Sequence, residues 1–211
     1  MNEVAIHQLD ERLQKQVDQA RQALQKGGVD YVVQVCGELL KKCPSAYEVR
    51  GLLWDALRMG QSGKPSRMRW LRDRSGGLQF KMATRSLLKN EPLEMVHRCD
   101  EMLHSKQLFA EVLDALDKAA KTLNWAETSV FACQAVVELD PGKTASRLAF
   151  AEALLNVGRP NQAIEQVEWV LAREPANGEA QTLLKNASVA ETLQRGNWED
   201  TETTFHTKKL T

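Results

Sequence analysis

The segment Asn156–Pro175 reads NVGRPNQAIEQVEWVLAREP, and the positions of its glycine, alanine and prolines indicate how the chain folds. Gly158 can adopt the left-handed backbone conformation that ends a helix at little cost. Ala163 is small enough to let two helices cross closely, and Pro175 lacks the backbone N–H that a continuing helix needs. The segment therefore predicts the end of one helix, a tight turn and a complete second helix.

The same pattern of a turn residue followed by a closing proline recurs at a fixed interval along the chain. Pro141 lies 34 residues before the closing proline of this segment, and Asn124 lies 34 residues before its glycine. The apolar residues between them have the spacing of one helical face. Residues 110–143 and 144–177 are therefore predicted to be two helical hairpins, with equivalent residues 34 positions apart.

Two further hairpins fit the same pattern. Residues 76–109 have Asn90 at the turn, but no proline closes the unit. Residues 13–46 have Gly27 at the turn and Pro44 at the end. We conclude that a helical hairpin is the repeating unit of the chain.

This period and its small residues resemble the tetratricopeptide repeat, or TPR. In residues 144–177, Phe150, Ala151 and Leu154 stand where the family has Leu, Gly and Tyr, while Asp117 departs from the Gly or Ala that the family prefers. The resemblance covers most of the chain, and the closing stretch is similar to that of a group of uncharacterised bacterial TPR proteins. It implies an all-α fold, a TPR-type α-solenoid of antiparallel helix pairs with a C-terminal capping helix.

Composition agrees with an all-α class. Hydrophobic residues make up 43% of the 211 residues and charged residues 27%, and good helix formers dominate. The N-terminus has no apolar core of a secretory signal, and no stretch approaches the length of a membrane helix. The sequence therefore favours a globular protein without membrane insertion, and we expect it in the cytoplasm.

The period breaks once, between two Gly-containing turns. We expect two modules hinged there, although a solenoid that continues through a degenerate helix is the alternative. The expected parts are an N-terminal TPR-like helical module (1–60), a basic linker or short helix (61–75), three repeats with a capping helix (76–109, 110–143 and 144–177 within 76–195) and a flexible tail (196–211).

Charge is distributed unevenly along the chain. Residues 58–89 hold nine bases and one acid, a net charge of 9 − 1 = +8, whereas residues 91–201 hold ten bases and 18 acids, a net charge of −8. A basic patch of Arg67, Arg69, Arg72 and Arg74 could grip phosphates, with Trp70 available to stack on a base. The alternatives are a linker whose arginines pair with the acidic repeats, or a surface for an acidic protein.

The sequence contains no recognisable catalytic constellation. Motifs for zinc proteases, serine hydrolases, P-loops and dinucleotide binding are all absent from it. His97 and His104 lie seven residues apart around Cys99, which is too wide a spacing for a zinc site without further ligands. The four cysteines lie among apolar residues and predict buried thiols. We expect no enzyme activity, no cofactor and no metal.

Stacked TPR hairpins form a superhelix whose concave side is lined by the first helix of each pair, and in that family this groove binds peptides. The matching positions here are Phe80, Thr84, Leu87, Leu88, Glu111, Asp114, Lys118, Lys121, Leu148, Glu152, Leu155 and Asn156. The Lys and Asn clamp of chaperone-binding TPR proteins is absent. A peptide with an apolar stretch and mixed charge fits this set better.

The sequence therefore predicts a protein-interaction scaffold that binds a peptide or protein segment. A nucleic-acid-binding helical protein that uses residues 58–89 is the alternative. Self-association into a homo-oligomer is also allowed, because the broken period leaves apolar edges uncovered.

Overall fold

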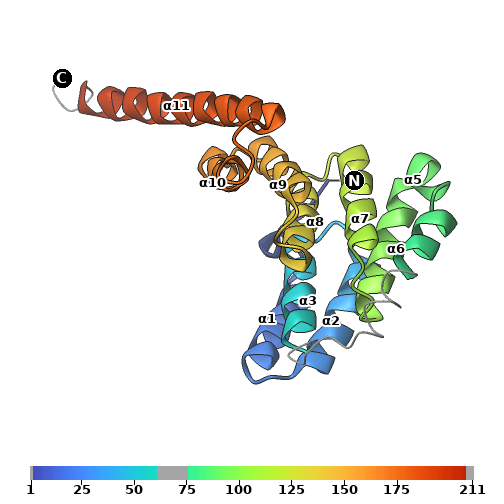
Figure 1. Ribbon diagram of the computed structural model, residues 1–211. Coiled ribbons are helices and arrows are strands. Elements are labelled where there is room, and N and C mark those ends of the chain that lie inside the picture. The colour runs from blue at the N-terminus through green and yellow to red at the C-terminus, as the bar shows by residue number, and fades with distance from the viewer. Residues whose placement is uncertain (1, 61–75, 208–211) are drawn as a thin grey trace. The chain divides into compact units, whose positions relative to one another are not determined.

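Every regular element in the described part of the chain is helical, which confirms the predicted all-α class (Figure 1). The computed structural model describes residues 2–60 and 76–207, with side chains up to residue 195. The chain divides into two compact units, Met1–Leu139 and Asp140–Thr211. This division falls inside the range 76–195 that the sequence analysis expects to be one stack, and the expected linker 61–75 lies outside the described residues.

The first unit begins with a 3-10 helix, and its other described elements are α-helices. Its elements are η1 (Ile6–Gln8), α1 (Glu11–Gln25), α2 (Val29–Lys42), α3 (Tyr47–Met59), a helix over residues 76–83, α5 (Leu87–Asn90), α6 (Pro92–His104), α7 (Ala110–Leu123) and α8 (Ala126–Leu139). The second unit contains α9 (Thr144–Asn156), α10 (Pro160–Leu171) and α11 (Gly178–Thr207).

Three of the four predicted turns share one backbone geometry. Gly27, Asn124 and Gly158 have φ angles of 80°, 57° and 70°, in the left-handed region. After each of them, the next N–H donates to the carbonyl five residues earlier, at 2.8, 2.8 and 2.9 Å, which is the Schellman pattern of helix ends. Asn90 differs, because it is the last residue of the short helix α5.

The helices of the first unit pack in two groups that also contact each other. Helices α1, α2 and α3 pack in sequence order, as do α6, α7 and α8, while α2 packs on α6 and α3 packs on α8 (Figure 1). Leu53 of α3, Leu103 of α6 and Val136 of α8 are therefore members of one core. A strict stack, in which each hairpin contacts only its neighbours, does not predict the contact between α3 and α8.

A buried ion pair lies where these two groups meet. Arg50 of α3 is fully buried, and its Nε and Nη2 atoms donate to the two carboxylate oxygens of Asp100 at 2.9 and 2.8 Å. The remaining donors of the guanidinium reach the carbonyl of Pro44 and, at 3.4 Å, the hydroxyl of Thr128. Its carbon atom lies 5.8 Å from the ring centroid of Trp125. One side chain thus joins α3 to α6 and α8.

The start of the chain adds a second tie to α8. The carboxylate of Glu3 accepts hydrogen bonds from the N–H groups of Glu127 and Thr128, at 2.8 and 2.6 Å. These two N–H groups belong to the first turn of α8, where no helical carbonyl can reach them and a negative charge is favoured. Nearby, the N–H of Val4 donates to the carbonyl of Ser45 at 3.0 Å. Glu3 therefore caps a helix far away in the sequence.

The hairpin of α7 and α8 contains the predicted departure from the family pattern, and the structure explains it. The carboxylate of Asp117 accepts hydrogen bonds from the Ser129 hydroxyl at 2.5 Å and from the Lys121 ammonium at 2.8 Å. The equivalent residues in the second unit are Ala151 and Ala163, which are both fully buried. A polar pair therefore replaces a small apolar pair at the same crossing.

Residues 76–109 do not repeat that arrangement. Ala83, which stands one period before Asp117, is exposed, and the neighbouring Met82 is 73% exposed. The buried face of the helix over 76–83 contains Gly77 and Phe80 instead, and it continues to Thr84 in the following turn. The helix ends at residue 83, before the turn that the period predicts at Asn90.

In the second unit, α9 and α10 form a hairpin and α11 packs on both. Arg147 of α9 and Arg173, just beyond α10, place their guanidinium carbons 3.9 and 3.4 Å from the ring centroid of Trp169. The Arg147 guanidinium also donates to the Gln166 side chain at 2.7 Å. Cation–π contacts of this kind stabilise helix pairs by roughly 0.5–1 kcal/mol each at exposed sites.

Helix α11 is longer than the sequence analysis expects. A flexible tail is expected from residue 196, yet the helix runs to Thr207. Gly196 is tolerated inside it at a cost of about 1 kcal/mol relative to alanine, and no proline interrupts the segment. The chain is therefore helical over most of the expected tail.

Candidate peptide-binding groove

A groove with a volume of about 410 Å³ lies in the first unit, between the helix over 76–83 with its following turn on one side and α7 on the other. It has an apolar floor and a charged rim. Its lining residues are Leu78, Lys81, Met82, Thr84, Arg85, Leu88, Met95, Glu111, Asp114, Ala115 and Lys118.

Two glycines set the close approach of the helix over 76–83 to the start of α7. A Cβ atom on Gly76 would lie 2.6 Å from Cζ of Phe109, and one on Gly77 would lie 2.2 Å from a carboxylate oxygen of Glu111. A side chain at Gly76 would require the buried Phe109 ring to move, whereas one at Gly77 would meet the flexible end of the Glu111 side chain, which can turn aside. The Gly-Gly pair that breaks the sequence period thus lies close to Phe109 and Glu111 at the start of α7.

The floor continues the core of the unit. Phe80 is 8% exposed and belongs to one core cluster with Met95, Val112 and Leu116. The hydroxyl of Thr84 donates to the carbonyl of Phe80 at 2.7 Å, so its polar group is satisfied within its own turn. The floor can therefore accept an apolar group without leaving a hydroxyl unpaired.

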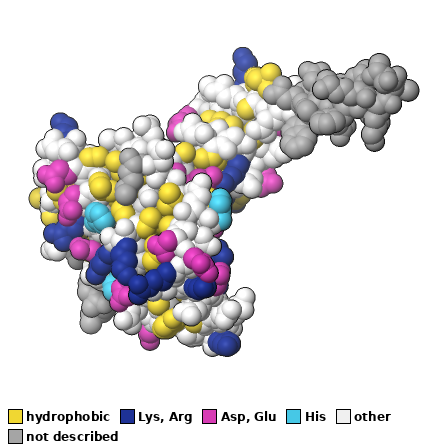
Figure 2. Space-filling view, turned by 180° about the vertical axis from the view of Figure 1, so that it is seen from behind, with side chains coloured by type: hydrophobic (Ala, Val, Ile, Leu, Met, Phe, Trp, Pro, Cys, Tyr) yellow, Lys and Arg dark blue, Asp and Glu magenta, His cyan; other side chains and the backbone are white. Residues whose placement is uncertain are grey.

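Large apolar side chains border the groove and remain exposed to solvent. Leu78 is 57% exposed and Met82 is 73% exposed. Figure 2 shows one face of the molecule on which hydrophobic side chains lie beside Lys and Arg. Clusters of exposed apolar side chains with a polar rim commonly mark interaction sites. Methionine is well suited to such surfaces because its side chain is flexible and polarisable.

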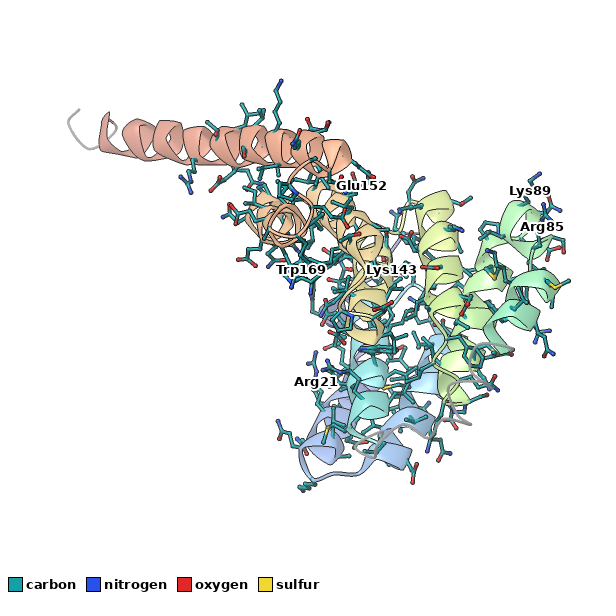
Figure 3. All side chains as sticks on the ribbon, viewed as in Figure 1. Arg21, Arg85, Lys89, Lys143, Glu152 and Trp169 are labelled. Carbon is teal, nitrogen blue, oxygen red and sulfur yellow. The ribbon has the colours of Figure 1, made fainter. Side chains whose placement is uncertain are left out.

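The rim carries more positive than negative charge. Lys81, Arg85 and Lys118 line the groove together with Glu111 and Asp114. Neither Lys81 nor Arg85 forms an ion pair with a residue that the structure describes, and the same is true of the nearby Lys89. Figure 3 shows Arg85 and Lys89 pointing outward from this edge of the unit. These cations are therefore available to an acidic ligand.

The structure brings some of the predicted groove residues together and separates others. Thr84, Leu88, Glu111, Asp114 and Lys118 line the groove. Phe80 lies in the core, Leu87 is half-buried outside the lining, and Lys121 pairs with Asp117. In the second unit, Leu148 is buried, Leu155 is half-buried, and Glu152, labelled in Figure 3, and Asn156 are exposed on α9.

Sequence reasoning missed most of the apolar lining. Leu78, Met82 and Met95 were not assigned to the groove. Lys81 and Arg85 were counted only as part of the basic segment. The buried spacing of Gly77, Phe80 and Thr84, three and then four residues apart, is the signal that would have placed the helix correctly. The predicted patch of Arg67, Arg69, Arg72 and Arg74 lies outside the described residues.

The described residues show no group of three or more His, Cys, Asp or Glu side chains that could hold a metal ion. His104 packs against the buried Gly37, where a Cβ atom would lie 2.2 Å from the imidazole Cδ2. Burial raises the pKa of Cys36 to about 12 and also raises the pKa of Cys99 and of Cys133. These thiols are therefore poor nucleophiles at neutral pH.

A smaller cavity of about 220 Å³ lies beside Trp54, Arg58, Leu108, Glu138 and Leu139. Its polar groups already satisfy one another. The carboxylate of Glu138 accepts from the Trp54 indole N–H at 2.7 Å and pairs with Arg58 at 2.9 Å. This arrangement fits a structural tie between α3 and α8 better than a binding site.

Comparison with known proteins leaves the groove as the main guide to function. No protein-family model and no curated protein matches the chain. Within the part of the chain that the structure describes, no helix is long and apolar enough to span a bilayer.

Proposed function

We propose that the chain is a non-catalytic interaction module that binds an apolar protein segment in the groove between the helix over 76–83 and α7. The observation that carries this proposal is the exposure of Leu78 and Met82, at 57% and 73%, beside an open groove with an apolar floor. Burial of such side chains by a ligand is favourable by roughly 1.5–3 kcal/mol each, before the cost of ordering the ligand.

The repeated hairpins support an interaction role of the TPR kind. Three hairpins, α1–α2, α7–α8 and α9–α10, turn at a left-handed residue with the same hydrogen bond across the turn. We propose that they derive from one TPR-like repeat, in which helices present binding surfaces instead of catalytic groups. The four cysteines are free thiols, and they support a place in the reducing cytoplasm.

The ligand would bind as a short helix or an extended segment. Its apolar side chains would enter between Met82, Leu88 and Ala115, and its polar groups would meet the charged rim. Because the groove is open and small compared with a standard protein interface, we expect dissociation constants on the order of micromolar.

Selection of peptides from a display library against the full chain tests this proposal. Selected peptides should bind the Met82→Glu variant at least about tenfold more weakly, because a buried charge replaces an apolar contact. Tyr31→Glu is the matched control, since Tyr31 is a 47% exposed apolar residue on α2 that does not line the groove. Peptides that bind wild type and Met82→Glu equally well would show that the groove is not the binding site.

A nucleic-acid role is the second candidate, and it is favoured by Lys81, Arg85 and Lys89, which form no ion pair with the residues that the structure describes. It predicts retention on DNA or RNA that weakens steeply with salt and is lost when Arg67, Arg69, Arg72 and Arg74 become Ala. A nucleic-acid role does not explain the apolar groove, so we place this role second.

A further inference from the structure

We infer that the groove receives the end of helix α11 from a second copy of the chain. The inference rests on the proposed function, because it names the segment that the groove binds. Three observations support it: cations at the groove that form no ion pair with a described residue, exposed apolar side chains on α11, and the chemistry of the sequence at the end of that helix.

The cations that line the groove outnumber its two carboxylates, those of Glu111 and Asp114. Lys81, Arg85 and Lys89 form no ion pair with a described residue, and Lys81 and Arg85 line the groove together with the exposed Leu78 and Met82. A ligand that combines large apolar side chains with carboxylates would satisfy both features. Phosphates of a nucleic acid would pair with the cations but would leave the apolar side chains uncovered.

Beyond Ala187, Gln194 of α11 still donates to the Gly158 carbonyl at 2.8 Å, but the described part of the helix also presents exposed apolar side chains. Ala180, Leu183 and Ala187 pack against α10 and α9, whereas Val189 and Leu193 are 53% and 64% exposed. From Ala187 to Thr207 the helix extends for about 30 Å at 1.5 Å per residue (Figure 1). Helices of this length gain most of their stability from packing against another surface.

The end of α11 has the chemistry that the groove requires. Residues 197–206 read NWEDTETTFH and combine Trp198 and Phe205 with the acids Glu199, Asp200 and Glu202. The two aromatic residues are seven positions apart, which is two helical turns. This segment therefore offers apolar anchors flanked by carboxylates to a groove that offers an apolar floor flanked by cations.

Sedimentation velocity of the full chain over a range of concentrations tests the inference. We expect concentration-dependent association that weakens as salt rises, because ion pairs contribute to it. The double variant Lys81→Glu, Arg85→Glu should weaken association at least about tenfold, since two attractions become repulsions. The matched control is Lys26→Glu, Lys143→Glu, which reverses two exposed lysines outside the groove and α11. Circular dichroism confirms that each variant is folded.

A peptide of residues 196–207 provides the second arm. An excess of this peptide should dissociate the assembly, and the same peptide with its three acids changed to Lys should not. A chain that stays monomeric at every concentration, or an assembly that persists in Lys81→Glu, Arg85→Glu, would overturn the inference. Binding of the tail within its own chain, seen as a monomer whose groove accepts the peptide only after truncation at Arg195, would overturn it as well.

The two proposals can fail separately. If the 196–207 peptide does not bind but display-selected peptides bind in a manner that Met82→Glu abolishes, the proposed function stands and the inference about α11 fails. If neither kind of peptide binds, both fail.

Discussion

Arg50 of α3 and Asp100 of α6 form a two-pronged ion pair that is closed to solvent, with side-chain exposures of 0% and 8%. Burial raises the pKa of Asp100, and the Arg50 guanidinium opposes that rise. Its Nη2 and Nη1 atoms also donate to the Pro44 carbonyl and the Thr128 hydroxyl, and its guanidinium carbon lies 5.8 Å from the Trp125 ring centroid. The pair therefore holds α3 against α6 and α8 in a defined register.

Removal of Arg50 should be among the most damaging single changes in the first unit. Arg50→Met leaves the Asp100 carboxylate buried without its counter-charge, and we expect a loss of about 3–5 kcal/mol in the free energy of unfolding. Urea denaturation of the variant and the wild type measures this loss. Arg58→Met, which breaks the more exposed pair with Glu138, should cost less than about 1 kcal/mol.

The loss in Arg50→Met should also depend on pH. Without Arg50, the pKa of Asp100 in the folded protein rises further above its unfolded value, so the folded state binds the proton more tightly. Stability of the variant relative to wild type should then improve as pH falls toward the acidic range. A deficit that is constant between neutral and acidic pH would contradict this account of the pair.

Asp117 and Ser129 should behave as a coupled pair. Asp117→Ala removes the acceptor of the Ser129 hydroxyl and should cost about 1–2 kcal/mol. The double variant Asp117→Ala, Ser129→Ala recreates the small pair found at Ala151 and Ala163. Its loss in the free energy of unfolding should therefore be smaller than the sum of the two single losses. A double-mutant cycle by urea denaturation gives the coupling, and strict additivity would argue against it.

Asp30 should titrate below the usual range of an aspartate. The Lys106 ammonium donates a hydrogen bond to its carboxylate at 2.6 Å and, with its positive charge, lowers the pKa of Asp30. Because the folded pKa is lowered, the resulting stability is present above the unfolded pKa and is lost as pH falls through the folded value. NMR titration should show the pKa return toward its usual value in Lys106→Gln; an unchanged pKa would rule out Lys106 as the cause.

Cys43 should be the reactive thiol of the native protein. It is half-buried, whereas Cys36, Cys99 and Cys133 are buried and burial raises their pKa values. A colourimetric thiol reagent should modify one cysteine rapidly in the folded chain and four after denaturation. Cys43→Ser should remove the rapid phase. Rapid modification of two or more thiols would mean that a buried cysteine opens readily to solvent.

The local features of the fold were predictable from sequence. The turns at Gly27, Asn124 and Gly158 follow from residues that tolerate the left-handed conformation, and the prolines beyond α2, α8 and α10 end helices by removing an N–H. These turns and helix ends depend on a few adjacent residues. They therefore recur in each repeat and can be recognised from the 34-residue period. The all-α class follows from the same pattern.

Long-range contacts were not predictable in this way. The period describes how a hairpin meets its neighbour, and it contains no information about α3 meeting α8 or Arg50 meeting Asp100. It also misplaced the buried face of the helix over 76–83, where Gly77 and Phe80 are buried and Ala83 is exposed. Part of the groove was predicted from sequence, but its apolar lining depends on which face of the helix over 76–83 is buried.

Hydrogen exchange of the full chain with and without a selected peptide tests the central claim most directly. Binding in the groove predicts slower exchange of backbone amides in residues 76–88 and 111–118, with little change in α1 or α10. Protection confined to the second unit, or to the surface of α2 around Tyr31, would contradict the claim that the groove between the helix over 76–83 and α7 is where this chain binds its ligand.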